Sequence, residues 1–296
     1  MPKQPLAEVF GFPINNFSTD AERYRRNRLC PFNNKVPSCT KDKAENPLGV
    51  CSVYDNSKVV VTCPVRFRQD WLIAEDAAAF FFPTGSSWTS LTEIRINDKY
   101  GRSAGNIDVV LVAYDSAGRI LNFGSLEVQA VYISGNIRRA FEYFMEDAEA
   151  RSDMDWSGQR HYPRPDYLSS SRKRLAPQLI YKGGILHAWG KKQAVAVDRH
   201  FFNSLPIMDE VDPVDAEMAW LVYDLQYDSQ QNRYQLTRFK TVYTQFSATL
   251  EKITTAEPGN IEGFIGHLQE KLDEKLEDAN SPDAPILLEI PGSEDI

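Results

Sequence analysis

The sequence has no long apolar run, no internal repeat and no glycine-rich phosphate loop. Its richest apolar stretches, residues 77–82 and 109–114, are far shorter than the roughly 18 residues that a membrane-spanning helix needs. The first residues lack the apolar segment of a secretory signal, and the 4 histidines show no metal-ligand spacing. We therefore expect a globular, cytoplasmic protein of bacterial type that has no membrane partner.

An excess of basic charge is also absent, because 33 Lys and Arg stand against 41 Asp and Glu and give a formal charge of −8. By itself this total argues against a nucleic-acid partner. The acids are concentrated at the C-terminus, however: residues 251–296 hold 12 acids and 3 lysines, which leaves +1 on residues 1–250. Residues 1–70 carry 11 bases and 7 acids, so a nucleic-acid partner stays open for the body of the chain.

Cysteine is absent after residue 63, and all the cysteines lie in one segment with the spacing C-x8-C-x11-C-x11-C: Cys30, Cys39, Cys51 and Cys63. The residues between them have a loop-like composition and include no C-x-x-C pair. In a reducing compartment, four clustered thiolates indicate a tetrahedral metal site, for which iron and zinc are both suitable. Four unrelated buried cysteines are the alternative, or two disulfides if the chain is secreted.

A metal-stapled segment of this size has little core of its own, and metal binding supplies part of its folding free energy. We therefore predict a four-cysteine metal-binding module in residues 1–70 and a larger domain in residues 71–296. Arg66 and Arg68 follow the last cysteine closely and are candidates for contact with DNA phosphates. A solvated surface is the alternative explanation of these arginines.

Residues 107–133 predict two strands and a turn. The first strand covers 107–114, and the second covers 119–133 with an irregularity at Gly124. Asp108 opens the first strand, and Glu127 and Gln129 share one face of the second, because side chains alternate along a strand. If the strands are antiparallel, Asp108 and Glu127 meet at one end of the hairpin and can share a divalent ion, as in metal-dependent phosphodiesterases.

The spacing I-D-x18-E-x-Q resembles the PD-(D/E)-x-K nuclease core, with Gln129 where lysine usually stands. Glutamine can still hydrogen-bond a water molecule but supplies no positive charge. Glu93 is a fourth candidate, because nuclease cores often place an extra acid on a helix before the first catalytic strand. The alternative for Glu93 is a capping box with Ser90 at the start of its own helix.

The rest of the chain predicts a helix over 136–149, a polar loop over 151–178, a hairpin of 219–227 with 234–246, and an amphipathic helix over 261–276 before an acidic tail. The polar loop combines aromatic and basic side chains, which suits contact with DNA grooves or phosphates. Its candidate DNA-binding residues are Arg160, Arg164 and Arg172.

Several short motifs in residues 8–135, taken together, resemble the NotI family of type II restriction endonucleases, which includes EagI-like enzymes. They are FGFP at 10–13, CPFNN at 30–34, CTK at 39–41, GVCS at 49–52, CP at 63–64, GNID at 105–108 and EVQ at 127–129, together with Glu93.

The resemblance implies an α/β (or α+β) PD-(D/E)-x-K nuclease core in residues 71–296 behind a DNA-contacting module, residues 1–70, in which the four cysteines bind a single iron. It further implies a homodimer that requires Mg²⁺ and cleaves GC-rich palindromes built around GGCC. The family carries glutamine in place of lysine, and the matching positions of its nuclease site are Glu93, Asp108, Glu127 and Gln129.

Two hypotheses follow. In the first, the protein is an endodeoxyribonuclease that hydrolyses both strands of a palindrome in double-stranded DNA, with Asp108 and Glu127 as Mg²⁺ ligands and Gln129 orienting the water. In the second, it is a non-catalytic, metal-stapled DNA-binding protein or a rubredoxin-like redox protein whose acids are structural. The second hypothesis predicts that Asp108→Ala is harmless whereas Cys39→Ser abolishes function.

Overall fold

The computed structural model describes residues 2–43 and 45–277. The chain divides into two compact units, residues 1–254 and residues 255–296, and each unit is described by itself.

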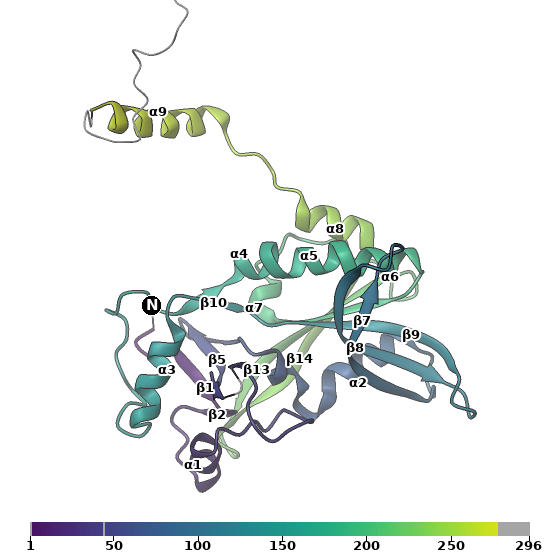
Figure 1. Cartoon of the computed structure of the whole chain (residues 1–296), viewed down its shortest axis with the longest axis horizontal. Coiled ribbons are helices and arrows are strands. Elements are labelled where there is room, and N and C mark those ends of the chain that lie inside the picture. Colours follow the sequence, from purple (N-terminus) through teal and green to yellow (C-terminus); the bar gives the residue numbers. More distant parts are fainter. Residues whose placement is uncertain (1, 44, 278–296) are drawn as a thin grey trace, which may run out of the picture. The chain divides into compact units, whose positions relative to one another are not determined.

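The first unit is built on a six-stranded mixed sheet with the strand order β14-β13-β12-β9-β8-β7 (Figure 1). β12 is parallel to both of its neighbours, and the other pairs are antiparallel. The two predicted hairpins are thereby confirmed. The strands are β7 (Trp88–Asn97), β8 (Ser103–Tyr114), β9 (Ile120–Gln129), β12 (Gln193–Asp198), β13 (Met218–Asp228) and β14 (Arg233–Thr244).

Helical segments make up much of the remaining regular structure, and one long helical run between β9 and β12 includes two π-helical stretches, η2 and η3. The segments are α1 (Thr19–Arg26), η1 (Pro64–Trp71), α2 (Leu72–Phe81), α3 (Ile137–Glu146), α4 (Tyr167–Ser170), η2 (Ser171–Leu175), α5 (Ala176–Gln178), η3 (Leu179–Gly183), α6 (Gly184–Ala188), α7 (Arg199–Phe202), α8 (Phe246–Thr254) and α9 (Ile261–Glu277).

Helices cover both faces of the sheet, because its central strands are apolar on both sides. α2 packs on one face, where Phe81 joins Leu126 and Leu221 in a buried cluster. On the other face, Trp220 packs with residues of η2, η3, α7 and α8, among them Leu179. Figure 1 shows α5 and α8 on one side of the sheet and α2 on the other. This layered α/β architecture confirms the predicted fold class.

A second sheet, with the order β2-β1-β5-β6, forms the N-terminal part of the same unit. The ring of Phe10 packs edge-on against Phe141 of α3 at 5.8 Å, and Trp156 belongs to the same buried cluster. The N-terminal residues thus share a core with α3, and the predicted boundary at residue 70 stays a prediction. The strands are β1 (Leu6–Val9), β2 (Phe12–Pro13), β5 (Val50–Asp55) and β6 (Lys58–Val61), and the short pair β3 (Asp42–Lys43) and β4 (Asn46–Pro47) lies between β2 and β5 in the chain.

The structure differs from the sequence prediction at Gly124 and in the polar segment. Gly124 lies in the regular ladder of β9, opposite Leu111, and not at an irregularity. A Cβ at Gly124 would lie 2.5 Å from the ring of Phe81, so α2 can pack this closely only on a glycine. The polar segment is helical from residue 167 onward, because Asp166 accepts a hydrogen bond from the backbone N–H of Ser169 and caps α4.

In the second unit, α9 confirms the predicted C-terminal helix. The acidic tail predicted after it lies outside the described residues. Across residues 2–43 and 45–277, we find no helix whose length and apolar content would suffice to span a membrane.

Candidate active site

The β8–β9 hairpin brings the two predicted metal-binding acids together. Val109 pairs with Leu126 in an antiparallel register, so Asp108 and Glu127 occupy the next position along the two strands. Asp108 Oδ2 accepts a hydrogen bond from the backbone N–H of Val128 at 2.8 Å. The side chain of Asp108 is therefore anchored beside Glu127, as the spacing of the two acids predicts.

Glu127 is a buried acid with one satisfied and one unsatisfied oxygen. Its side chain is 7% exposed and its Oε2 accepts a hydrogen bond from Lys182 Nζ at 2.6 Å, whereas Oε1 is buried without a partner. Burial, and after it the negative charge of Asp108, raise the pKa of Glu127 to about 7 against the opposing effect of Lys182. An unpartnered carboxylate oxygen next to a second carboxylate suits a divalent cation, which would compensate both charges.

Gln129 follows on the same face of β9 and is 4% exposed. Its Nε2 donates a hydrogen bond to the carbonyl oxygen of Ala130 at 2.7 Å. Together with Asp108, Gln129 lines a cleft of about 780 Å³. The amide thus lies at the wall of an open space that also contains one of the two acids.

The structure contradicts the predicted helix around Glu93, because residues 88–97 form strand β7. Ser90 pairs with Leu111, so a capping box with Glu93 is also excluded. Thr92 and Ile94 pair with residues on either side of Asp108, which places exposed Glu93 beside Asp108 across the strand pair. The φ of Glu93 is +58°, and such left-handed backbone in a strand often occurs next to a functional site.

The 780 Å³ cleft extends from the nuclease hairpin to the cysteine-containing segment. Beside Asp108 and Gln129 it is lined by the basic residues Lys41, Lys173 and Arg174. Positive side chains around paired acids suit a phosphodiester backbone, which needs neutralisation before it can approach the acids. Lys41 belongs to the CTK motif at 39–41, but sequence reasoning assigned it no contact with DNA.

The arginines predicted to contact DNA lie in different environments. Arg66 is fully buried: its Nε forms an ion pair with Glu8 Oε2 at 3.1 Å, and its Nη2 donates to the carbonyl oxygen of Tyr234. This guanidinium stabilises the junction between the N-terminal sheet and β14, and it does not reach a phosphate. Arg68 is half-buried, and Arg160, Arg164 and Arg172 are exposed.

The four cysteines line one small cavity of about 10 Å³. Burial raises the pKa of Cys30 to about 11 and also raises the pKa of Cys39 and Cys51. A bound cation would reverse this effect, because it stabilises the thiolate. The donor set and its convergence suit a tetrahedral metal, although no three metal-binding side chains of the described residues stand in a ready ligand arrangement.

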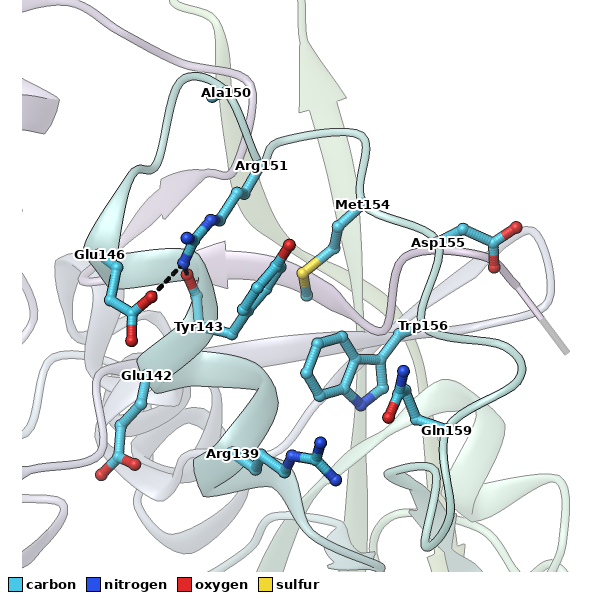
Figure 2. Close-up of a pocket in the computed structure, with 10 residues that line it drawn as sticks. All are labelled: Arg139, Glu142, Tyr143, Glu146, Ala150, Arg151, Met154, Asp155, Trp156 and Gln159. Atoms are coloured by element: carbon cyan, nitrogen blue, oxygen red, sulfur yellow. Dashed lines mark hydrogen bonds and ion pairs between the residues drawn. The ribbon is translucent and has the colours of Figure 1, made fainter.

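A separate pocket of about 450 Å³ lies between α3 and the segment that follows it. Figure 2 shows Arg151 directed toward Glu146, with which it forms an ion pair, and lying near the ring of Tyr143. Trp156 lines the pocket as well. None of the predicted nuclease acids lies here, and the charge of Arg151 is already compensated, so this pocket does not compete with the hairpin as a catalytic site.

Lys182 is the functional candidate that sequence reasoning missed. It lies 55 residues from Glu127 in the chain, in a segment that contains no motif predicting a helix. Only the packing of η3 on the sheet brings it to the acid.

Comparison with known proteins gives one finding. A family model described as restriction endonuclease NotI matches residues 9–236, more than three quarters of the chain. The matched range includes the four cysteines, Glu93 and the whole β8–β9 hairpin. None of the curated proteins matches the chain.

Proposed function

The chain belongs to the NotI family of type II restriction endonucleases, and from this premise we propose that it hydrolyses both strands of a GC-rich palindrome, centred on GGCC, with Mg²⁺ held by Asp108 and Glu127. The family makes the protein an endodeoxyribonuclease with DNA as its partner. The second hypothesis, a non-catalytic or redox protein, is set aside on this ground.

One observation carries the assignment of the site. Glu127 Oε1 is buried and has no hydrogen-bond partner, and burial, followed by the negative charge of the neighbouring Asp108, raises the pKa of Glu127. A buried acceptor without a partner costs about 1–3 kcal/mol, a cost that is accounted for if the oxygen is reserved for a metal ion. Bound there, Mg²⁺ would polarise the scissile phosphate and favour ionisation of the attacking water.

The neighbouring side chains have distinct roles in this proposal. Gln129, on the wall of the cleft, orients the attacking water by hydrogen bonding, which an amide does without carrying charge. Glu93, beside Asp108 on β7, supports the water or a metal ligand from the edge strand. Lys41, Lys173 and Arg174 contact phosphates in the same cleft.

We also propose that the enzyme acts as a homodimer, because a two-fold protein matches the two-fold symmetry of a palindrome. Each protomer then cleaves one strand. The β8–β9 hairpin of the described residues brings together one pair of candidate metal-binding acids, Asp108 and Glu127, so two protomers are needed for two cuts.

The cysteine cluster is proposed to bind one structural metal ion, iron by likeness to the family or zinc by the same donor chemistry. Its support is that Cys30, Cys39, Cys51 and Cys63 all line one cavity. Such a site stabilises a segment whose β3 and β4 strands have only two residues each.

The nuclease proposal is tested with Asp108→Asn and Glu127→Gln, each assayed on a sequenced GC-rich plasmid with Mg²⁺. We expect each substitution to lower the cleavage rate by at least about 100-fold, because both remove a metal-binding charge. Both variants should still bind the DNA when Ca²⁺ replaces Mg²⁺. End mapping of the wild-type products gives the recognition sequence, and cleavage at the wild-type rate by both variants would overturn the assignment.

The structural metal is tested by elemental analysis of the purified protein and of Cys39→Ser. We expect one iron or zinc per wild-type chain and its loss from the variant, with a lower melting temperature because metal binding contributes folding free energy. The Cys39→Ser substitution leaves both nuclease acids, Asp108 and Glu127, unchanged. A wild-type protein without bound metal after anaerobic purification would contradict this part of the proposal.

A further inference from the structure

The nuclease site contains a cation that its own hairpin does not supply. Where lysine would stand two residues after Glu127, the chain has the neutral Gln129. The ammonium group of Lys182, from η3, instead lies 2.6 Å from Glu127 Oε2.

The contacts of Lys182 are specific and enclosed. The residue is 5% exposed, and its Nζ donates to Glu127 Oε2 and, at 2.8 Å, to the backbone carbonyl oxygen of Asn106. Asn106 lies on β8, two residues before Asp108. The ammonium group is therefore held between the two strands that carry the metal-binding acids.

The GNID motif at 105–108 receives this lysine. Gly105 has a φ of +122°, which favours glycine, and a Cβ built on it would be 3.5 Å from Lys182 Cδ. The carbonyl of Asn106 then accepts from the ammonium group, and Asp108 supplies the acid. One short segment thus accommodates the aliphatic chain of the lysine and anchors its charge.

The backbone around Lys182 is also unusual. η3 is a π-helical stretch of 5 residues within the run from α4 to α6, and π-helical insertions are rare and frequently found at functional sites. Such a stretch changes the helical phase and so sets which side chain faces the sheet. Here it directs Lys182 to Glu127.

Stability alone does not account for this pair. Burying two charges is costly, and well-packed apolar residues in their place are often as stable or more so. A purely structural pair would also be expected to satisfy both carboxylate oxygens, yet Oε1 of Glu127 has no partner. The arrangement holds one oxygen and leaves the other available.

We propose that Lys182 is the positioning cation of the nuclease site. It is supplied by η3 and substitutes for the lysine of the nuclease motif, whose position in β9 is occupied by Gln129. It fixes Glu127 through Oε2, leaves Oε1 for the metal, and keeps a positive charge beside the reacting phosphate. The inference rests on the proposed role of Asp108 and Glu127.

The test is Lys182→Met, which keeps an unbranched side chain as far as the Cε position and removes the ammonium group. We expect kcat to fall by at least about 100-fold at saturating Mg²⁺, as for loss of one preorganised electrostatic group, while KM for the DNA stays within about threefold. The matched control is Lys191→Met, since Lys191 Nζ donates to Asn122 at 2.8 Å on the same strand β9 but lies away from the acids. It should retain the wild-type kcat.

The decisive variant is Lys182→Met with Gln129→Lys, which moves the cation back to the strand of Glu127. Recovery of kcat by at least about tenfold over Lys182→Met supports the proposal, because a purely structural lysine would not be replaced from position 129. Should Lys182→Met fail to fold, the double variant decides alone: cleavage within about 100-fold of wild type supports the proposal, and a folded but inactive protein overturns it.

The outcomes separate this inference from the proposed function. If Asp108→Asn and Glu127→Gln cleave DNA normally, the proposed site itself fails. If those variants are inactive while Lys182→Met keeps the wild-type kcat, or if Gln129→Lys restores nothing, only the role of Lys182 is overturned.

Discussion

Two buried acids on neighbouring strands have opposite hydrogen-bonding environments. Asp198, at the end of β12, accepts hydrogen bonds from the backbone N–H groups of Val61, His200 and Phe201. Glu127, on β9, has a single partner and an unsatisfied oxygen. At the scale of the residue, the number of hydrogen bonds that a buried carboxylate accepts therefore distinguishes an acid that organises the fold from an acid that is available for chemistry.

Asp198 predicts a pH dependence of stability. Burial raises its pKa to about 7 despite the three N–H donors. The folded protein then binds more protons than the unfolded chain between about pH 4 and 7, so the free energy of unfolding falls as the pH rises through this window. Asp198 changes the free energy of unfolding by at most about 4 kcal/mol across this pH window.

The measurement is urea unfolding at several pH values, without added divalent cation, for the wild type and for Asp198→Asn. Glu127 acts in the same sense in both proteins, so the difference between them isolates Asp198. We expect a smaller decrease of the unfolding free energy with pH in the variant. Equal slopes in the two proteins would contradict this assignment.

At the scale of the element, the β8–β9 hairpin is positioned by helices on both of its faces. α2 approaches Gly124 on one face, and η3 delivers Lys182 to Glu127 on the other. Glu93 joins from the edge strand β7, between Thr92 and Ile94, which pair with the residues on either side of Asp108. The geometry of the acids thus depends on elements that are distant in the chain.

Two glycine-to-alanine substitutions, one under the closely packed helix α2 and one in open space, should have opposite effects on the stability of the protein. Gly124→Ala should destabilise the protein by about 1–3 kcal/mol, because its Cβ would overlap the ring of Phe81 and force a shift. Gly184→Ala, in a helical position with no atom within 4 Å of the new Cβ, should stabilise it by up to about 1 kcal/mol.

Denaturant unfolding of both variants checks this pair of predictions. Adding Phe81→Leu to Gly124→Ala should restore part of the loss, since the smaller side chain makes room for the methyl group. A Gly124→Ala protein as stable as the wild type would show that α2 adjusts without cost.

At the scale of the whole molecule, the charge is distributed unevenly between the two units. Residues 259–296 hold 10 acids and 2 lysines, so their removal changes the formal charge from −8 to zero. The basic residues of the cleft all lie in the first unit. We therefore expect attraction to DNA to arise locally and against the net charge of the chain.

Truncation after residue 258 tests this distribution. We expect the remaining protein to keep its melting temperature, because the first unit is compact by itself, and to bind non-cognate DNA more tightly, because a repulsive charge has been removed. Fluorescence titration with a non-cognate duplex at several salt concentrations measures the change. Unchanged or weaker non-specific binding would contradict the repulsive role of the C-terminal segment.

Much of the fold is determined locally and was therefore predictable. Alternating and continuous apolar runs specified the β8–β9 and β13–β14 hairpins, and the amphipathic periodicity specified α3 and α9. The strand of Glu93 was missed because residues 88–97 carry a capping pattern that also occurs in strands. The helical run from α4 was missed because its polar side chains resemble a loop.

The sequence by itself determined the cysteine cluster, the Asp108 and Glu127 pairing and the resemblance to the NotI family, because each depends on residues near one another in the chain or on a strand register of fixed period. Only the tertiary structure decided that Arg66 is buried with Glu8 and that Lys182 contacts Glu127, 58 and 55 residues away respectively in the chain. Contacts of this kind depend on how whole elements pack. No local sequence pattern specifies which distant element supplies the partner of a buried charge.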